Sequence, residues 1–365
     1  MYKNRVSVVR TSLPTIKADS FLVSNFYSIF YLTGIQTLTP EEREAFLFIT
    51  EKNTYFFTDG RYVDDELLNK ISSLNGTFKL IEVGKGLMYH LGEIIKEEKL
   101  QSIAFEEEDL KYKEYLSLQN LLIKLTPVAH LITGLREIKT TEEVELVKKA
   151  CELTDLCLAE ITPLIKPKMS EKELSWKLES WIREHGYQIA FDPIVAVDQN
   201  SAIPHYDTRT GNGVIGASSI LLLDFGIRYK NYNSDITRMV FIGKQSDEVI
   251  HTYKRLAAAQ EKTVQFVKKG VELREVDLFC REQLKKYHLP DYMHSTGHGV
   301  GLEVHELPKV SFNSKDTLKQ QHIFTIEPGV YLLGKYGMRV EDTVYIDKDF
   351  NASQLTLFSK EFINL

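Results

Sequence analysis

Cysteine is scarce in this sequence, and no apolar run is long enough to cross a bilayer. The three cysteines, Cys151, Cys157 and Cys280, form no CxxC pair, and their odd number gives no disulfide framework. We therefore expect buried thiols and a reducing compartment. No long apolar segment follows the N-terminal residues Met1–Val6, so we expect no signal peptide, no membrane partner and a cytoplasmic location.

An excess of positive charge is also missing. The chain has 45 lysines and arginines against 51 aspartates and glutamates, which gives a formal net charge of -6. Basic pairs such as Lys268–Lys269 are short and typical of solvated helix faces, so we expect no nucleic-acid partner. The remaining composition is ordinary for a globular protein, since 43% of the 365 residues are hydrophobic, and this length predicts two domains.

Strand-like and helix-like segments alternate in the first part of the chain, which is typical of an α/β domain. Aromatic and β-branched residues predict the strands, and the polar segment Glu51–Thr54 predicts a hairpin turn between two of them. The predicted strands cover residues 20–25, 26–32, 45–50, 55–58 and 102–105, and a predicted helix covers 87–98. A junction at 127–134 separates an N-terminal domain, residues 1–130, from a C-terminal domain, residues 136–365.

Two capping boxes mark the beginnings of helices in the second part of the chain, Thr140 with Glu143 and Ser170 with Glu173. Apolar residues at helical spacing follow each box and predict one buried face per helix. Later segments predict helices over 251–269 and 273–287 and strands over 218–224, 235–243, 323–326 and 339–346.

Four carboxylates stand at or within segments that read as buried strands: Asp224, Asp235, Glu327 and Glu341. A buried carboxylate is costly unless it is paired or coordinated. Hairpins that turn at 229–233 and within 328–337 would bring these acids together, where their like charges would raise one another's pKa. The sequence therefore predicts a divalent metal site, and the alternative is that each acid pairs with a lysine or arginine at the surface.

Histidines extend this predicted site. Three of them, His294, His298 and His305, fall within the twelve residues of HSTGHGVGLEVH. Glycines on either side of His298 let the backbone approach a metal or a substrate closely. His205 lies in a loop before the first acidic strand and would be weak support by itself.

Taken in order, the motifs LLLDFG, SDITR, HSTGHGVGLEVHE, IEPGVY and MRVED resemble the metallopeptidases of the pita-bread fold, which include prolidase, aminopeptidase P and methionine aminopeptidase. The resemblance is close across residues 136–365. The N-terminal part is similar more loosely, through FLVSN, YLTG and TDGRY, to the smaller bacterial Xaa-Pro peptidases. The fold class that this implies is α/β (α+β), with a creatinase-like N-terminal domain followed by a pita-bread catalytic domain.

The resemblance implies two divalent metal ions in each subunit. It places Asp224 on one metal, Asp235 and Glu341 between both metals, and His298 and Glu327 on the second. Four oxygen ligands and one imidazole suit manganese first, with cobalt, iron or zinc as alternatives. Two such metals would hold a water molecule between them and lower its pKa, which provides the nucleophile for peptide hydrolysis.

The resemblance also implies a substrate site. It makes Glu327 a proton shuttle, gives His205, His294 and His305 roles at the scissile amide, and lets Arg339 pair with an acidic neighbour or with the substrate carboxylate. We expect a homodimer that cleaves the Xaa-Pro bond of peptides with proline in the second position, as an aminopeptidase or as a strict dipeptidase.

Two other readings stay open on the same fold, a metal-independent creatinase-like hydrolase and a non-catalytic binding protein. Relatives of either kind tend to lose metal ligands, and this chain keeps all five positions. The chain departs from the family pattern where Val197-Asp198-Gln199 precedes Asn200, and this departure bears on fine specificity.

Overall fold

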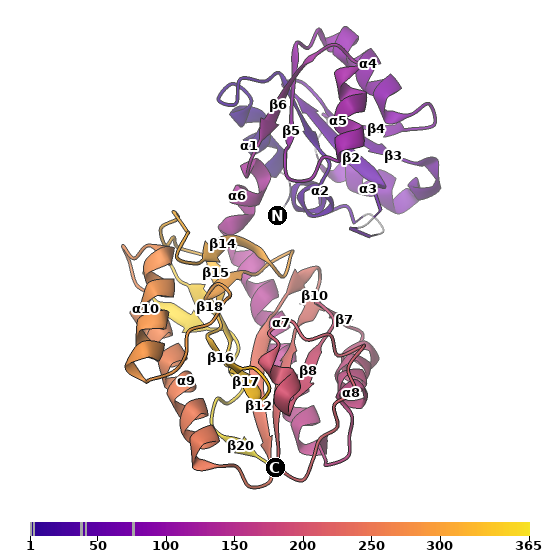
Figure 1. Cartoon of the computed structure of the whole chain (residues 1–365). Coiled ribbons are helices and arrows are strands. Elements are labelled where there is room, and N and C mark those ends of the chain that lie inside the picture. Colours follow the sequence, from indigo (N-terminus) through magenta and orange to yellow (C-terminus); the bar gives the residue numbers. More distant parts are fainter. Residues whose placement is uncertain (1, 3, 37–38, 41, 75–76) are drawn as a thin grey trace. The chain divides into compact units, whose positions relative to one another are not determined.

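The computed structural model describes residues 2, 4–36, 39–40, 42–74 and 77–365. The chain divides into two compact units, Met1–Arg136 and Glu137–Leu365 (Figure 1). The boundary between the units, after Arg136, lies shortly beyond the junction expected at 127–134. In the structure, this junction contains the end of one strand and part of a helix.

Unit 1 is an α/β unit around a six-stranded sheet in the order β4-β3-β2-β1-β5-β6. Strand β2 is antiparallel to both of its neighbours, whereas β4 on β3, β5 on β1 and β6 on β5 are parallel pairs. The elements in this part of the chain are α1 (Arg5–Ser12), β1 (Ser20–Val23), α2 (Phe26–Thr33), β2 (Ala45–Thr50), β3 (Thr54–Thr58), η1 (Gly60–Tyr62), α3 (Asp65–Leu74), β4 (Phe78–Glu82), α4 (Leu87–Glu98), β5 (Ser102–Glu106), α5 (Tyr112–Gln119), β6 (Lys124–Val128) and α6 (Leu131–Glu137).

The strand predicted over 26–32 is wrong, because this aromatic segment forms helix α2. The capping interactions at the two ends of this segment favour a helix. The side chain of Asn25 accepts a hydrogen bond from the backbone N–H of Ser28 at the beginning of the helix, and Gly34 ends it in the left-handed conformation at φ 68°. These caps and the burial of the segment outweigh its intrinsic preference for strand. The other strands and the helix predicted in unit 1 are confirmed.

Unit 2 combines four helices with several small sheets (Figure 1). Helix α7 begins with the predicted capping box of Thr140 and Glu143, and Ser170 caps α8. The elements are α7 (Thr141–Ile161), η2 (Thr162–Leu164), α8 (Glu171–Glu184), β7 (Gln188–Ile189), β8 (Ile194–Val197), η3 (Asp198–Ala202), β9 (Ser219–Phe225), β10 (Ile227–Tyr229), β11 (Tyr232–Asn233), β12 (Ile236–Ile242), α9 (Asp247–Phe266), α10 (Leu273–Lys286), β13 (Gly297–Gly299), β14 (Glu306–Val310), β15 (Ile323–Ile326), β16 (Gly329–Leu332), β17 (Tyr336–Arg339), β18 (Asp342–Ile346), β19 (Ala352–Gln354) and β20 (Ile363–Asn364).

Two helix-on-sheet layers form the core of unit 2. In the first layer, α7 and α8 pack against β8, β9 and β12 through residues such as Leu158, Leu178 and Leu223. In the second, α9 and α10 pack against β15 and β18 through residues such as Val276 and Phe324. The opposite face of the β9–β12 sheet packs through residues such as Leu222 and Phe241 against Tyr253 of α9 and Met338 of β17, and it also carries the inward side chains that follow these apolar residues.

The strand predicted over 339–346 is interrupted, and this is a second correction. Strand β17 ends at Arg339 and β18 begins at Asp342. The N–H of Val340 donates to the carbonyl of Pro328, which continues the β16–β17 pairing by one residue, whereas the N–H of Glu341 donates to the carbonyl of Thr237 on β12. Glu341 therefore leaves the β16–β17 ladder and bonds to a different sheet.

The three cysteines are free and buried, as the sequence predicted. Burial raises the pKa of the Cys280 thiol to about 11, so this group is not poised as a nucleophile. Within the described residues, no helix has the length and apolar character that a membrane crossing requires.

Candidate metal centre and substrate site

The alternation of side chains along β9 and β12 places the first two acids. Leu221, Leu223 and Phe225 face the α7–α8 layer, so Asp224 points to the opposite face. Strand β12 pairs antiparallel with β9, and Thr237 lies directly opposite Asp224. Asp235 shares the face of Thr237, two residues away along the chain.

The alternation of side chains along β15, together with the pairing of β15 with β18, brings Glu327 and Glu341 to the same site. Phe324 and Ile326 of β15 pack toward α9 and α10, so Glu327 follows them on the inward side. Strand β15 pairs antiparallel with β18, and Glu341 directly precedes β18. The N–H of Glu341 bonds to the carbonyl of Thr237 at 3.2 Å, which ties the second hairpin to the first.

Three of the expected ligands converge closely enough to share an ion. Ligand atoms of Asp235, His298 and Glu341 all lie within 4.8 Å of one another. Nε2 of His298 is 3.3 Å from Oε1 of Glu327 and 3.7 Å from Oδ2 of Asp235. Asp224 lies outside this closest group, and its carboxylate instead accepts a hydrogen bond from Arg339. The sequence-predicted acids and His298 are thus assembled in one site.

Within this cluster, the pKa values of Asp235 and Glu341 are raised, whereas the pKa of Glu327 is lowered. Burial raises the pKa of Asp235 well above its ordinary value, and the neighbouring carboxylates add to the shift. Burial and the charges of Glu327 and Asp224 likewise raise the pKa of Glu341 to about 8. Burial alone would raise the pKa of Glu327 as well, but its hydrogen bond with His298 and nearby cationic groups lower it to about 2.

The donors present fit a divalent cation. The buried Oδ1 of Asp235 has no hydrogen-bond partner among the residues that the structure describes. A buried carboxylate oxygen without a partner costs folding free energy, and a bound cation would remove this cost. The set of carboxylates with one imidazole is a hard, oxygen-rich one, so the site suits manganese, cobalt or iron and also accommodates zinc.

Residues behind the ligands hold them in place. The hydroxyl of Thr237 donates to Oε2 of Glu341 at 2.6 Å and accepts from Nε of Arg339 at 2.9 Å. The same guanidinium pairs with Asp224 and donates to the hydroxyl of Tyr331 at 3.0 Å. Because Arg339 is only 4% exposed, the geometry favours its pairing with an acidic neighbour over direct contact with a substrate carboxylate.

The predicted substrate histidines lie around this centre. The ring of His305 is 4.2 Å from the ring of His298, and both His305 and His205 are exposed. Burial lowers the pKa of His294, and burial with the charge of His298 lowers that of His305 to about 4. His205 contributes electrostatically to both shifts, which places its ring near the other two, and the lowered pKa values favour neutral rings at His294 and His305.

Sequence reasoning missed Tyr331 as a site residue. Its hydroxyl lies 2.9 Å from Nε2 of His294 and accepts from Arg339, so it links a substrate histidine to the guanidinium that pairs with Asp224. Strand β16 carries no predicted ligand, so the position of Tyr331 gave no separate signal. Only its place within the motif IEPGVY pointed toward the site.

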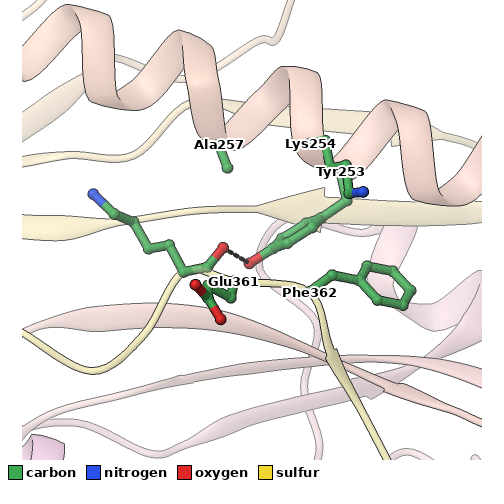
Figure 2. A pocket seen from close by; sticks show the side chains of 6 residues that line it. Tyr253, Lys254, Ala257, Glu361 and Phe362 are labelled. Carbon is green, nitrogen blue, oxygen red and sulfur yellow. Dashed lines mark hydrogen bonds between the residues drawn. The ribbon is translucent and has the colours of Figure 1, made fainter.

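A hollow of about 490 Å³ lies elsewhere in unit 2, between α9 and the C-terminal segment (Figure 2). It is lined by Tyr253, Lys254, Ala257, Lys360, Glu361 and Phe362. The hydroxyl of Tyr253 donates to the carbonyl of Lys360 at 3.0 Å, and the amine of Lys360 is occupied by Glu261 and Asp342. None of the expected site residues lines this hollow, so it is separate from the metal centre.

Comparisons with known proteins agree with this architecture. The family model described as metallopeptidase family M24 matches residues 145–348, and the model of the creatinase/prolidase N-terminal domain matches residues 5–138. The chain is 30% identical over 365 residues to the uncharacterized peptidase YqhT of Bacillus subtilis, covering 99% of this chain and 100% of that protein.

Solved structures of similar proteins include an Xaa-Pro dipeptidase from Bacillus anthracis, with a TM-score of 0.91, 30% identity and 99% of both chains covered. An X-Pro aminopeptidase from Thermotoga maritima has a TM-score of 0.84 and 31% identity, with 97% of this chain and 100% of that chain covered. The expected fold class, a creatinase-like N-terminal domain followed by a pita-bread domain, is confirmed by the two matched regions.

Proposed function

Because the chain belongs to metallopeptidase family M24, we propose that it is a dinuclear-metal peptidase that hydrolyses Xaa-Pro bonds. The substrates would be dipeptides, or peptides with proline in the second position. The solved relatives include proteins named as an Xaa-Pro dipeptidase and as an X-Pro aminopeptidase. These names support cleavage of an Xaa-Pro bond, and they are compatible with either dipeptides or longer peptides as substrates.

One observation carries the proposal, the convergence of Asp235, His298 and Glu341 with a buried carboxylate oxygen that lacks a partner among the described residues. Asp224 and Glu327 complete the proposed ligand set. When bound, the metals would supply a water of lowered pKa and polarise the scissile carbonyl. Manganese is the first metal to test, for the reasons of ligand hardness given above.

The chain's own residues would orient the peptide and move the proton. Glu327 lies 3.3 Å from Nε2 of His298 at the proposed centre, and the family resemblance gives it the transfer of a proton from the attacking water to the leaving nitrogen. His205, His294 and His305 would hold the peptide carbonyl and stabilise the oxyanion, and the lowered pKa values of His294 and His305 favour their neutral, hydrogen-bonding forms.

The test is hydrolysis of Ala-Pro and of Ala-Pro-Ala by the full chain reconstituted with Mn²⁺. Cleavage of the dipeptide alone would make the protein a dipeptidase, and cleavage of the tripeptide would make it an aminopeptidase. The variant Glu341→Ala removes a carboxylate that would hold the metals. It should lose more than about 100-fold in activity, because even residues that only support a ligand contribute about 10- to 100-fold.

The matched control is Glu282→Ala, which removes an exposed glutamate from α10 of the same unit and should behave as the parent. If the parent cuts neither peptide, or if Glu341→Ala cuts as well as the control, the assignment fails and the binding-protein alternative takes its place. The family resemblance also leads us to propose a homodimer, which light scattering after size-exclusion chromatography would test.

A further inference from the structure

A second buried carboxylate, Glu171, is outside the ligand set and gathers four hydrogen bonds of its own. It is the first residue of α8 and is fully buried. Oε1 accepts from the backbone N–H of Val197 at 2.7 Å and from the side-chain amide of Asn200 at 2.9 Å. Oε2 accepts from the hydroxyl of Tyr206 at 2.7 Å and from the N–H of Gly213 at 2.8 Å.

The space around this carboxylate is closed. A Cβ atom placed on Gly213 would lie 2.4 Å from the carboxyl carbon of Glu171. One placed on Gly211 would lie 2.1 Å from the hydroxyl oxygen of Tyr206 and 2.9 Å from Oε2 of Glu171. All three distances are shorter than real Cβ atoms essentially ever show, so a side chain at either glycine would displace Tyr206 or Glu171.

Three of the four donors belong to one segment of chain, Val197–Tyr206. Val197 ends β8, Asn200 lies in η3, and Tyr206 directly follows His205. The amide of Asn200 also donates to the hydroxyl of Tyr206 at 2.9 Å, so the two ends of the segment are joined through the same carboxylate. The loop that presents His205 is therefore closed at its base by Glu171.

The middle of the segment is fixed to β17, through Gly337 and Arg339. The hydroxyl of Ser201 donates to the carbonyl of Gly337 at 2.9 Å and accepts from the N–H of Gly337 at 2.8 Å. The carbonyl of Pro204 accepts from Nη1 of Arg339 at 3.2 Å. The exposed imidazole of His205 is therefore carried by a loop that is held at both ends and in the middle.

We propose that Glu171 is a positioning residue for the peptide substrate, which acts by fixing the loop Val197–Tyr206 and thereby the ring of His205. The inference rests on the proposed peptidase function. Glu171 is fully buried and bonds only to the loop and its surroundings, so it touches neither substrate nor metal and works through His205. A carboxylate suits this task because its two oxygens accept from four donors, which no neutral side chain of this size can do.

The test is the substitution Glu171→Gln, which keeps the shape but turns one acceptor into a donor that meets other donors. We expect kcat/KM for the Xaa-Pro peptide to fall about tenfold to hundredfold, the range expected when a substrate-positioning group shifts by about 1 Å. Metal content should not change. Glu173→Gln, on the exposed side of the same helix, is the matched control and should match the parent.

A double-mutant cycle separates positioning from general stability. In the background His205→Ala, Glu171→Gln should cost less than about threefold, because the group through which it acts is gone. An equal loss in both backgrounds would overturn the inference. Should Glu171→Gln fold poorly, Tyr206→Phe removes one of the four donors and keeps the ring, and it must show the same dependence on His205.

Hydrogen exchange of the metal-free protein provides a readout independent of activity. Glu171→Gln should speed exchange at the amides of Val197 and Gly213 and leave β12 and β15 unchanged. Unchanged exchange at both amides would overturn the inference whether or not the parent cuts Xaa-Pro peptides. If the parent is inactive but the loop amides respond, the peptidase proposal fails, and the role of Glu171 in fixing the loop is retained.

Discussion

Replacing Arg238 with methionine should destabilise unit 2 and weaken its metal centre together. Arg238 lies on β12 between Thr237 and Met239 and is 1% exposed. Its Nη2 is 2.6 Å from Oδ1 of Asp342, which is fully buried. The guanidinium also donates to the carbonyls of Glu341 and Phe358, so it joins β12 to the backbone of a proposed metal ligand.

The expected magnitude follows from these contacts. Removing one partner of a buried ion pair costs about 3–5 kcal/mol, because the other charge is left uncompensated. Asp342 keeps the amine of Lys360 at 2.8 Å, which places Arg238→Met at the lower end, about 3 kcal/mol. For a domain of 150–250 residues this lowers Tm by roughly 6–12 °C.

The chain provides its own probe for the assay. Both tryptophans, Trp176 and Trp181, lie on α8, so their fluorescence reports the unfolding of unit 2. The control is Lys149→Met, which breaks an exposed pair with Glu152 at 3.1 Å and should leave the stability of unit 2 close to that of the parent. A loss below about 1 kcal/mol for Arg238→Met, or an unchanged affinity for Mn²⁺, would refute the reasoning.

Two further predictions follow from single groups. Tyr331→Phe removes the hydroxyl that joins His294 to Arg339, so kcat/KM should fall about 10- to 100-fold with metal content unchanged, and activity within about twofold of the parent would contradict this role. In unit 1, burial raises the pKa of Glu106 to about 7 from an ordinary value of 4.5, so the folded state binds more protons than the unfolded state between these values. The stability of unit 1 should therefore fall as pH rises from about 4.5 to about 7, and calorimetry of Glu106→Gln should show a smaller fall; an identical slope in both proteins would be evidence against this assignment.

Hydrophobic patterning made most of the fold of unit 2 predictable. The run before Asp224 is fully buried along β9, as a continuous apolar strand should be, and the capping box at Thr140 begins α7 where expected. The failure at 26–32 has a local cause. Aromatic and β-branched composition describes how well a segment fits a buried surface, and here the side-chain cap at Asn25 selected helix for the same apolar residues.

The proposed ligands stand out in the sequence, whereas the residues that support them do not. An acid that ends an apolar strand conflicts with its surroundings, and this conflict is visible in the sequence at Asp224 and Glu327. Supporting residues show no such conflict until their partners are known. Glu171 opens a helix, where an acid is ordinary, and its role depends on a partner such as Tyr206, 35 residues away in the chain.

The geometry of the metal centre is set where the two hairpins meet, and Thr237 lies at that point. It is opposite Asp224 in the β9–β12 ladder, its hydroxyl bonds to Glu341 and Arg339, and its carbonyl accepts the N–H of Glu341. A strand unbroken through 341 would have fixed Glu341 to its own ladder. The break between β17 and β18 frees that amide to bond across to β12, so the first hairpin positions the carboxylate of the second. The alternation of side chains along a strand specifies which face of the sheet each residue occupies. It does not specify the hydrogen bond from Glu341 to Thr237 that joins the two hairpins. The sequence therefore predicted that the acids share a site, but it could not predict the distances between them.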